Sequence, residues 1–312
     1  ILDDQERVVA ALAGRPKDPA WGEVATGAAE LCTGIRERGE DLGLFQDEHT
    51  SHRRGDFTAL SIGVSHGGGQ TRPSNLFHPT KRRELLKTLL EDKSIQRIAG
   101  FQSSSLSVYA PKMSTYYNTT LKSLFQHPDF RHLSSNFHNS IFPATMFNLG
   151  PKCITHEHTD PGNVAFGLCA ITALGNFNPK TSGLLILYDL KLLIQFPPAS
   201  TILIPSAIFR HGNTPIQDGE DRMSMTQYSA GGLFRYVRHG FKTVNQLPKQ
   251  LRGTIDGKHE ERVEEALSLF SKFSELERDR VQRFSAQPVR SLLDLFLGVL
   301  NIKSGLVILF TT

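Results

Sequence analysis

Apolar residues in the first half of the chain recur mainly at helical spacing. The pattern holds over Val8–Leu12 and again over Val24–Leu31, which predicts helix across the first forty residues. The glycines of Gly67–Gly69 then mark a loop, because three in succession cannot hold a regular element. A basic amphipathic helix is predicted to begin at Pro79, and a second to cover Ser114–Phe125.

From Ile141 the pattern changes to short runs of β-forming residues separated by turn residues. The predicted strands are Ile141–Leu149, Val164–Leu174, Gly183–Leu190, Thr201–Ile204 and Met223–Tyr228. Several short strands at this spacing are typical of a sandwich or jelly roll rather than of alternating βαβ units. Beyond Gln246 the chain becomes charged and helical, most clearly over His259–Arg283.

These patterns together predict one α+β fold, with a jelly-roll core of strands and helices from both ends of the chain packed around it. We expect residues 1–140 to form a helical region with a Gly-rich loop and a basic segment. Residues 141–245 should form the β-core, and residues 246–312 a C-terminal helical region.

Composition is that of a folded enzyme. The chain has 312 residues, of which 39% are hydrophobic and 21% charged, so wholesale disorder is excluded. The net charge of +4 permits an anionic partner such as nucleic acid without requiring one. Cys32, Cys153 and Cys169 show no CxxC spacing, which argues against a disulfide scaffold or a structural zinc site.

The longest apolar stretch is Ser291–Phe310, and polar residues interrupt it at Asp294, Asn301 and Lys303. A membrane span needs about 20 residues with few or no charges, so we expect no membrane association. The stretch is either a buried terminal helix or strand, or an extension foreign to the fold.

The strongest chemical signal is His158-Thr159-Asp160, which lies between two predicted strands. Side chains at positions i and i+2 of a strand or turn point to the same side, so these two can bind one face of a metal ion. His211, followed by a turn signal at the end of a strand-like segment, supplies a third ligand. Two histidines and one carboxylate with open positions are typical of non-haem Fe(II) oxygenases.

Two other segments match the same spacing. His127-Pro128-Asp129 precedes a predicted turn, and His259-Glu260-Glu261 lies on a charged helix with no histidine after it. About one chance match of this kind is expected in a chain of this composition, and we assign no metal to either.

Arg222 and Ser224 follow His211 on the last predicted strand, where they share one side. A guanidinium can make paired charge-assisted bonds to a carboxylate, and a hydroxyl adds one more. The order His-x-Asp, His, Arg-x-Ser therefore indicates an iron site beside a site for a carboxylate.

In this order the residues resemble the 2-oxoglutarate oxygenase superfamily, which has a double-stranded β-helix fold. Within it they resemble the TET/JBP dioxygenases that oxidise methylated bases in DNA, most closely the fungal members found in mushrooms. The motifs lie within Ile141–Gly232, and the Gly-rich loop and basic helix before them are similar too.

The resemblance implies Fe(II) bound by His158, Asp160 and His211. It also implies 2-oxoglutarate as co-substrate, with its far carboxylate at Arg222 and Ser224 and its near end at Asn148. His156 faces the same side as His158, but the His158–Asp160 register is the one that resembles the oxygenases. That leaves His156 behind the ligands or on the substrate side.

For the substrate, the resemblance implies a methylated base flipped out of double-stranded DNA, with Asn163 bonding its edge and Tyr228 stacking on it. Ala230 stands where the animal TET enzymes carry a histidine that contacts the pyrimidine. Both 5-methylcytosine, oxidised to 5-hydroxymethylcytosine and further, and N6-methyladenine, demethylated to adenine, therefore remain candidate bases.

Phosphates of the DNA would be bound by the Gly-rich loop and the basic helix. The expected contacts are Gly67, Gly68, Gly69, Gln70, Arg72, Lys81, Arg82 and Arg83. A second basic run contains Arg235, Arg238, His239 and Lys242.

We further expect O2 as co-substrate, a monomer, and a nuclear location that follows from the substrate. Two alternatives stay open: a hydroxylase of a small molecule or protein with the same iron site, and a catalytically inactive DNA-binding module.

Overall fold

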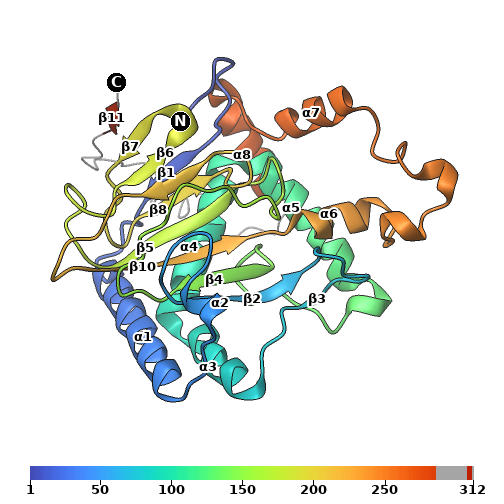
Figure 1. Ribbon diagram of the computed structural model, residues 1–312. Helices are drawn as coiled ribbons and strands as arrows, with labels where there is room; N and C mark the ends of the chain where they lie inside the picture. The colour runs from blue at the N-terminus through green and yellow to red at the C-terminus, as the bar shows by residue number, and fades with distance from the viewer. Residues whose placement is uncertain (286–307, 311–312) are drawn as a thin grey trace.

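The computed structural model describes residues 1–285 and 308–310, which form two antiparallel sheets with helices around them (Figure 1). The larger sheet has seven strands in the order β1-β8-β5-β10-β4-β2-β3. In the same order, their bounds are Ala11–Gly14, Thr201–Ile204, Cys169–Asn176, Asp221–Tyr228, Ala144–Asn148, Ala59–Ser65 and Ser74–Asn75. Every pairing in this sheet is antiparallel, as the jelly-roll prediction requires.

The smaller sheet has four strands in the order β11-β7-β6-β9. Their bounds are Ile308–Phe310, Leu192–Ile194, Leu185–Leu187 and His211–Asn213. Its apolar residues, such as Leu187 and Ile194, pack against Ile202 and Ile204 of β8 in the larger sheet. The two sheets therefore face each other over part of their area.

Eight helices surround the sheets in the described part of the chain. They are α1 (Trp21–Asp41), α2 (Asp47–Thr50), α3 (Thr80–Glu91), α4 (Lys93–Tyr109), α5 (Pro111–Gln126), α6 (Gly231–Arg238), α7 (His259–Ser268) and α8 (Leu276–Ser285). Local chemistry sets some of the boundaries. Asp92 ends α3 and accepts the backbone N–H groups of Ser94 and Ile95 to begin α4, and Pro111 occupies the first turn of α5.

Helices α1, α3 and α4 cover the face of the large sheet that points away from the small one (Figure 1). Gln102 fixes α4 to the sheet, because its Nε2 donates to Thr172 Oγ1 at 2.8 Å and to the Met225 carbonyl at 2.9 Å. On β4 and β10, Phe147 and Met225 face these helices. The alternate residues of both strands face the small sheet and line a cavity there.

The predicted β-rich core and most predicted elements are confirmed. The prediction of helix from the first residue is wrong, because Ala11–Gly14 forms β1 and pairs with β8; helix begins only at Trp21. The segment predicted as helix from His259 is broken between α7 and α8. The patterns also missed α4, α6 and β2.

The first 140 residues supply three strands to the large sheet, so they are built into the core as well as packed on it. The division into three regions stays a prediction. No helix in the described residues is long and apolar enough to cross a membrane. Of the apolar tail, only Ile308–Phe310 is described, as β11 paired with β7, and the prediction for residues 291–307 lies outside the described residues.

We expect Phe147→Ala to lower the free energy of unfolding by about 3–5 kcal/mol. Phe147 is fully buried on β4 between two neighbouring strands, so truncation leaves a cavity against α1 and α4. Phe77→Ala is the matched control, because Phe77 is 81% exposed and should cost less than about 0.5 kcal/mol. Urea unfolding followed by circular dichroism measures both, and equal losses would contradict this packing.

Candidate metal centre and its pocket

Two backbone hydrogen bonds join His158 to His211. The N–H of His158 donates to the His211 carbonyl at 3.0 Å, and the N–H of His211 donates back to the His158 carbonyl at 2.9 Å. His158 lies in the segment before Asp160, and His211 is the first residue of β9, not the end of a strand as the sequence suggested. This reciprocal pair places the two imidazole rings side by side, with centroids 4.2 Å apart.

Each imidazole is oriented by a carbonyl two residues earlier in the chain. His158 Nδ1 donates to the carbonyl of His156, and His211 Nδ1 donates to that of Phe209, both at 2.9 Å. A carbonyl can only accept, so in each ring Nδ1 carries the proton and Nε2 keeps a free lone pair. Both Nε2 atoms are therefore available as metal ligands.

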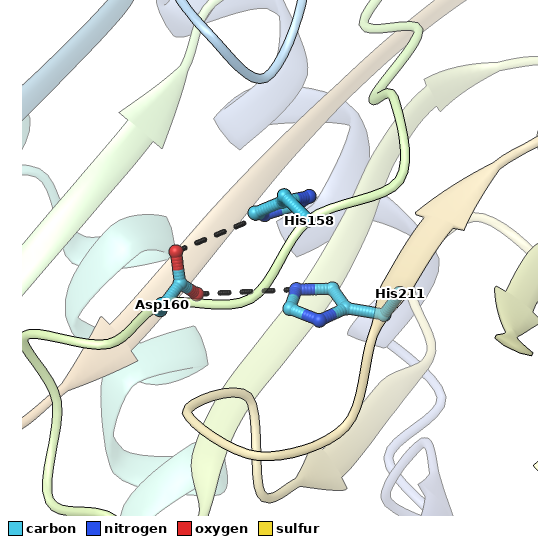
Figure 2. A group of neighbouring side chains, drawn as sticks. All are labelled: His158, Asp160 and His211. Atoms are coloured by element: carbon cyan, nitrogen blue, oxygen red, sulfur yellow. Dashed lines mark ion pairs between the residues drawn. The ribbon is translucent and has the colours of Figure 1, made fainter. Parts of the chain in front are cut away.

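Asp160 completes the group (Figure 2). Its backbone N–H donates to the Ser206 carbonyl at 2.8 Å, which fixes the residue opposite the two rings. Asp160 Oδ1 lies 3.7 Å from His158 Nε2, and Oδ2 lies 3.9 Å from His211 Nε2. One donor atom from each residue lies within 4.8 Å of the others, which suits a single divalent cation. In the described residues this is the one such group found, and it contains no residue of 127–129 or 259–261.

Burial favours the uncharged imidazoles that a metal requires. Desolvation, together with the neighbouring His211, lowers the pKa of His158 to about 4, and burial also lowers the pKa of His211. Both rings are therefore neutral near pH 7, and no proton has to leave before a cation binds.

A cavity of about 280 Å³ extends from the metal ligands between the two sheets. Arg222 lies within it, 4% exposed, and has no acidic partner in the described part of the chain. Its Nη1 makes only long bonds, to the Cys153 carbonyl at 3.3 Å and to Asn213 Oδ1 at 3.5 Å, and its Nε has no partner. A buried guanidinium without a counter-ion is costly, so this end of the cavity is built for an anion.

Ser224 and Asn148 lie beside Arg222 because β10 and β4 pair in register at these residues. Asn148 Nδ2 donates to Ser224 Oγ at 2.8 Å, while Asn148 Oδ1 is buried without a partner. The structure thus brings all three predicted co-substrate residues into the cavity that holds the metal ligands.

Asn163 and Tyr228 also line this cavity. Asn163 Nδ2 donates to Cys169 Sγ at 3.3 Å and to Ser206 Oγ at 3.2 Å, so its amide is held by the protein. Burial raises the pKa of Tyr228, and its hydroxyl therefore stays protonated. Their roles toward a base stay predictions.

Sequence reasoning missed Arg53 and Arg54, which come from the segment before β2. Arg53 Nη1 donates to the Thr159 carbonyl at 2.9 Å, beside the metal ligand Asp160. Arg54 lines the cavity, where burial lowers its pKa, and its carbonyl accepts the N–H of His156 at 2.7 Å. No local spacing connects these residues with the ligands; the adjacent pair of arginines was the only signal.

His156 itself does not line the cavity. Its side chain is exposed, and its contribution to the site is the carbonyl that orients the His158 ring. Of the two places predicted for it, the structure supports the one behind the ligands.

Most predicted DNA contacts are exposed, and Arg82 is the exception. Gly67–Gly69, Gln70, Arg72, Lys81 and Arg83 lie on the surface. Arg72 is already paired with Asp129 at 2.5 Å. Arg82 is 7% exposed and its Nη1 lies 2.8 Å from His49 Nε2, so the protein itself holds this guanidinium, and its contact with DNA stays a prediction. Successive helical residues turn by about 100°, which places Arg82 on the side of Leu85, Leu86 and Leu89.

In the second basic run, some residues are paired inside the protein and others are exposed. His239 is buried against Asp256, 2.9 Å away, and Arg238 pairs with Glu265 at 2.8 Å. Arg235 and Lys242 are exposed. Only part of this run is therefore free to meet a phosphate.

No protein-family model and no curated protein matches the sequence. Solved structures do show a likeness in fold. One is NgTET1 in complex with 5mC DNA, 19% identical, covering 65% of this chain and 69% of that one with a TM-score of 0.45. Another is an oxidoreductase of the 2OG-Fe(II) oxygenase family from Burkholderia pseudomallei, 16% identical, covering 65% of this chain and 91% of that one with a TM-score of 0.30. At these identities and TM-scores the likeness assigns no function to this chain.

We expect His158→Ala and Asp160→Ala each to weaken Fe(II) binding by more than about 100-fold, because each removes one of three donors. His127→Ala and Asp129→Ala are the matched controls, since they have the same spacing but lie outside the donor group. Anaerobic titration calorimetry measures all four. Wild-type affinity in His158→Ala would show that the ligands are assigned wrongly.

Proposed function

We propose that the chain is an Fe(II)- and 2-oxoglutarate-dependent dioxygenase that oxidises the methyl group of a base in DNA. The observation that carries this proposal is the buried Arg222, which forms no ion pair with any acidic residue in the described part of the chain. It shares its cavity with two histidines and an aspartate. The proposal includes a double-stranded β-helix formed by the two facing sheets. It also includes kinship with the TET/JBP branch and its fungal members.

The residues present fit both bound groups. His158, Asp160 and His211 would hold Fe(II) from one side and leave positions open. With 2-oxoglutarate and O2, such an iron couples loss of CO2 and formation of succinate to insertion of one oxygen atom into a C–H bond. Arg222 and Ser224 would hold the far carboxylate, and Asn148 presents an unpartnered amide oxygen beside them.

DNA as substrate is supported by the cavity and by the surface. A cavity of about 280 Å³ cannot admit a duplex, so a base would have to leave the stack to reach the metal. Tyr228 and Asn163 line that cavity, and Lys81 and Arg83 are exposed on α3 for phosphate contacts. Ala230 is buried just before α6 and makes an isolated β-bridge with Asn163. Both methylated bases stay in the proposal. We also propose that the protein acts as a monomer in the nucleus.

We expect Arg222→Gln to raise the KM for 2-oxoglutarate by about 10- to 150-fold, because one charge-assisted pair to the carboxylate is lost. Fe(II) affinity should hold, since Arg222 is not a metal ligand. Arg97→Gln is the control, an arginine on the surface paired with Asp18. An unchanged KM in Arg222→Gln would mean that the co-substrate binds elsewhere.

We expect the protein, given Fe(II), 2-oxoglutarate and O2, to convert methylated duplexes with release of succinate. Parallel duplexes carrying 5-methylcytosine or N6-methyladenine, analysed by mass spectrometry of the nucleosides, identify the base. Asp160→Ala should yield neither succinate nor oxidised base. Succinate formation with no change in either duplex would exclude DNA and favour a hydroxylase of another substrate.

A further inference from the structure

A second and larger cavity adjoins the metal pocket. It has a volume of about 860 Å³ and lies between the Gly-rich loop, the segment 161–166, α6 and α7. Gly162 and Asn163 line both cavities, so the two meet along the segment that follows Asp160. We call this second cavity the flank groove.

At Gly162 no side chain separates the two cavities. A Cβ added there would meet no atom within 4 Å, and the residue does not have a positive φ. Space is therefore open for a Cβ at this position, and the backbone conformation suits a residue other than glycine. A substrate that fills the metal pocket can continue across Gly162 into the flank groove.

One wall of the flank groove is aromatic. Tyr116 lies in tilted contact with Phe166 and Phe234, with ring centroids 5.8 and 5.3 Å apart, and all three line the groove. Phe234 is buried, while the partly exposed Tyr116 and Phe166 are aromatic side chains of the kind on which a planar base can stack whatever its sequence. Gly67 and Gly68 form the facing edge, and a Cβ at either would meet no atom within 4 Å.

The charges left unpaired in the flank groove are positive. Its acidic residue, Asp256, is already bonded to His239, and Arg238 is paired with Glu265. Arg235 and Arg262 are exposed, and neither forms an ion pair with a described residue. His66, 9% exposed, lines the same groove, and its Nδ1 lacks a hydrogen-bond partner.

We propose that the flank groove binds the nucleotide next to the reacting base, with its base on the aromatic wall and its phosphate at Arg235 and Arg262. This inference rests on the proposed function. The metal pocket of about 280 Å³ has to hold the co-substrate as well as the reacting base, so the rest of the strand lies outside it. The flank groove adjoins that pocket and matches the ring and the charge of a nucleotide.

Two pairs of variants test the proposal. Arg235→Glu reverses an exposed charge in the groove, and Arg15→Glu reverses an exposed charge that does not line it. Gly162→Ala and Gly162→Phe fill the rim to different extents. The probe is a fluorescein-labelled duplex with a single 5-methylcytosine, read by fluorescence anisotropy at several salt concentrations. Fe(II) and 2-oxoglutarate affinities and the thermal midpoint are measured on every variant.

We expect Arg235→Glu to weaken duplex binding by about tenfold. The slope of the logarithm of the binding constant against the logarithm of the salt concentration should become shallower by about one, as for a lost phosphate contact. Arg15→Glu should change affinity by less than about twofold. Oxidation of the base should fall from wild type through Gly162→Ala to Gly162→Phe, by about tenfold or more in the last, while the 2-oxoglutarate affinity holds.

If Arg235→Glu and Gly162→Phe both oxidise and bind the duplex as well as wild type, the flank groove does not bind the neighbouring nucleotide. The proposed function would then still stand. A wild-type protein that consumes 2-oxoglutarate but neither binds nor oxidises the duplex would overturn the DNA substrate, and the flank groove with it. The two failures therefore differ in the behaviour of the wild-type protein.

Discussion

The site depends on the pair of backbone hydrogen bonds that His158 and His211 exchange. These bonds hold a loop residue against the first residue of β9, so the two imidazoles cannot separate without breaking both. Carbonyls then set the ring orientations, and Ser206 holds Asp160 opposite them. Because the donors are positioned by backbone, the metal centre is preorganised before any ion binds.

A second constraint comes from strand geometry. Residues two apart on β10 share a face, and the register with β4 brings Asn148 against Ser224. The same alternation turns Phe147 and Met225 toward the helices, so apolar packing on one face fixes the polar residues on the other. Arg222 is buried with no acidic partner among the described residues, which is tolerable where a bound anion supplies the missing negative charge. Binding of the co-substrate should therefore stabilise the folded protein.

Some of the basic residues predicted to meet DNA are held inside the protein, and others are exposed and free to contact a partner. Arg82, Arg238 and His239 are held by His49, Glu265 and Asp256. Lys81, Arg83 and Arg235 remain exposed around the Gly-rich loop, α3 and α6. A count of basic residues would overstate the surface available to phosphates, because half of this group already has partners inside the protein.

Spacing and residue chemistry were enough to predict the group of His158, Asp160 and His211, the pairing of Arg222 with Ser224, and the β-rich core. His158 and Asp160 share a side through local geometry, as do Arg222 and Ser224. Three features could be known only from the folded protein: Ala11–Gly14 is a strand, Arg82 is buried, and Arg54 lines the metal pocket. Those outcomes depend on partners distant in the chain: a strand forms where another offers its edge, and a charge is buried where a distant group receives its hydrogen bonds.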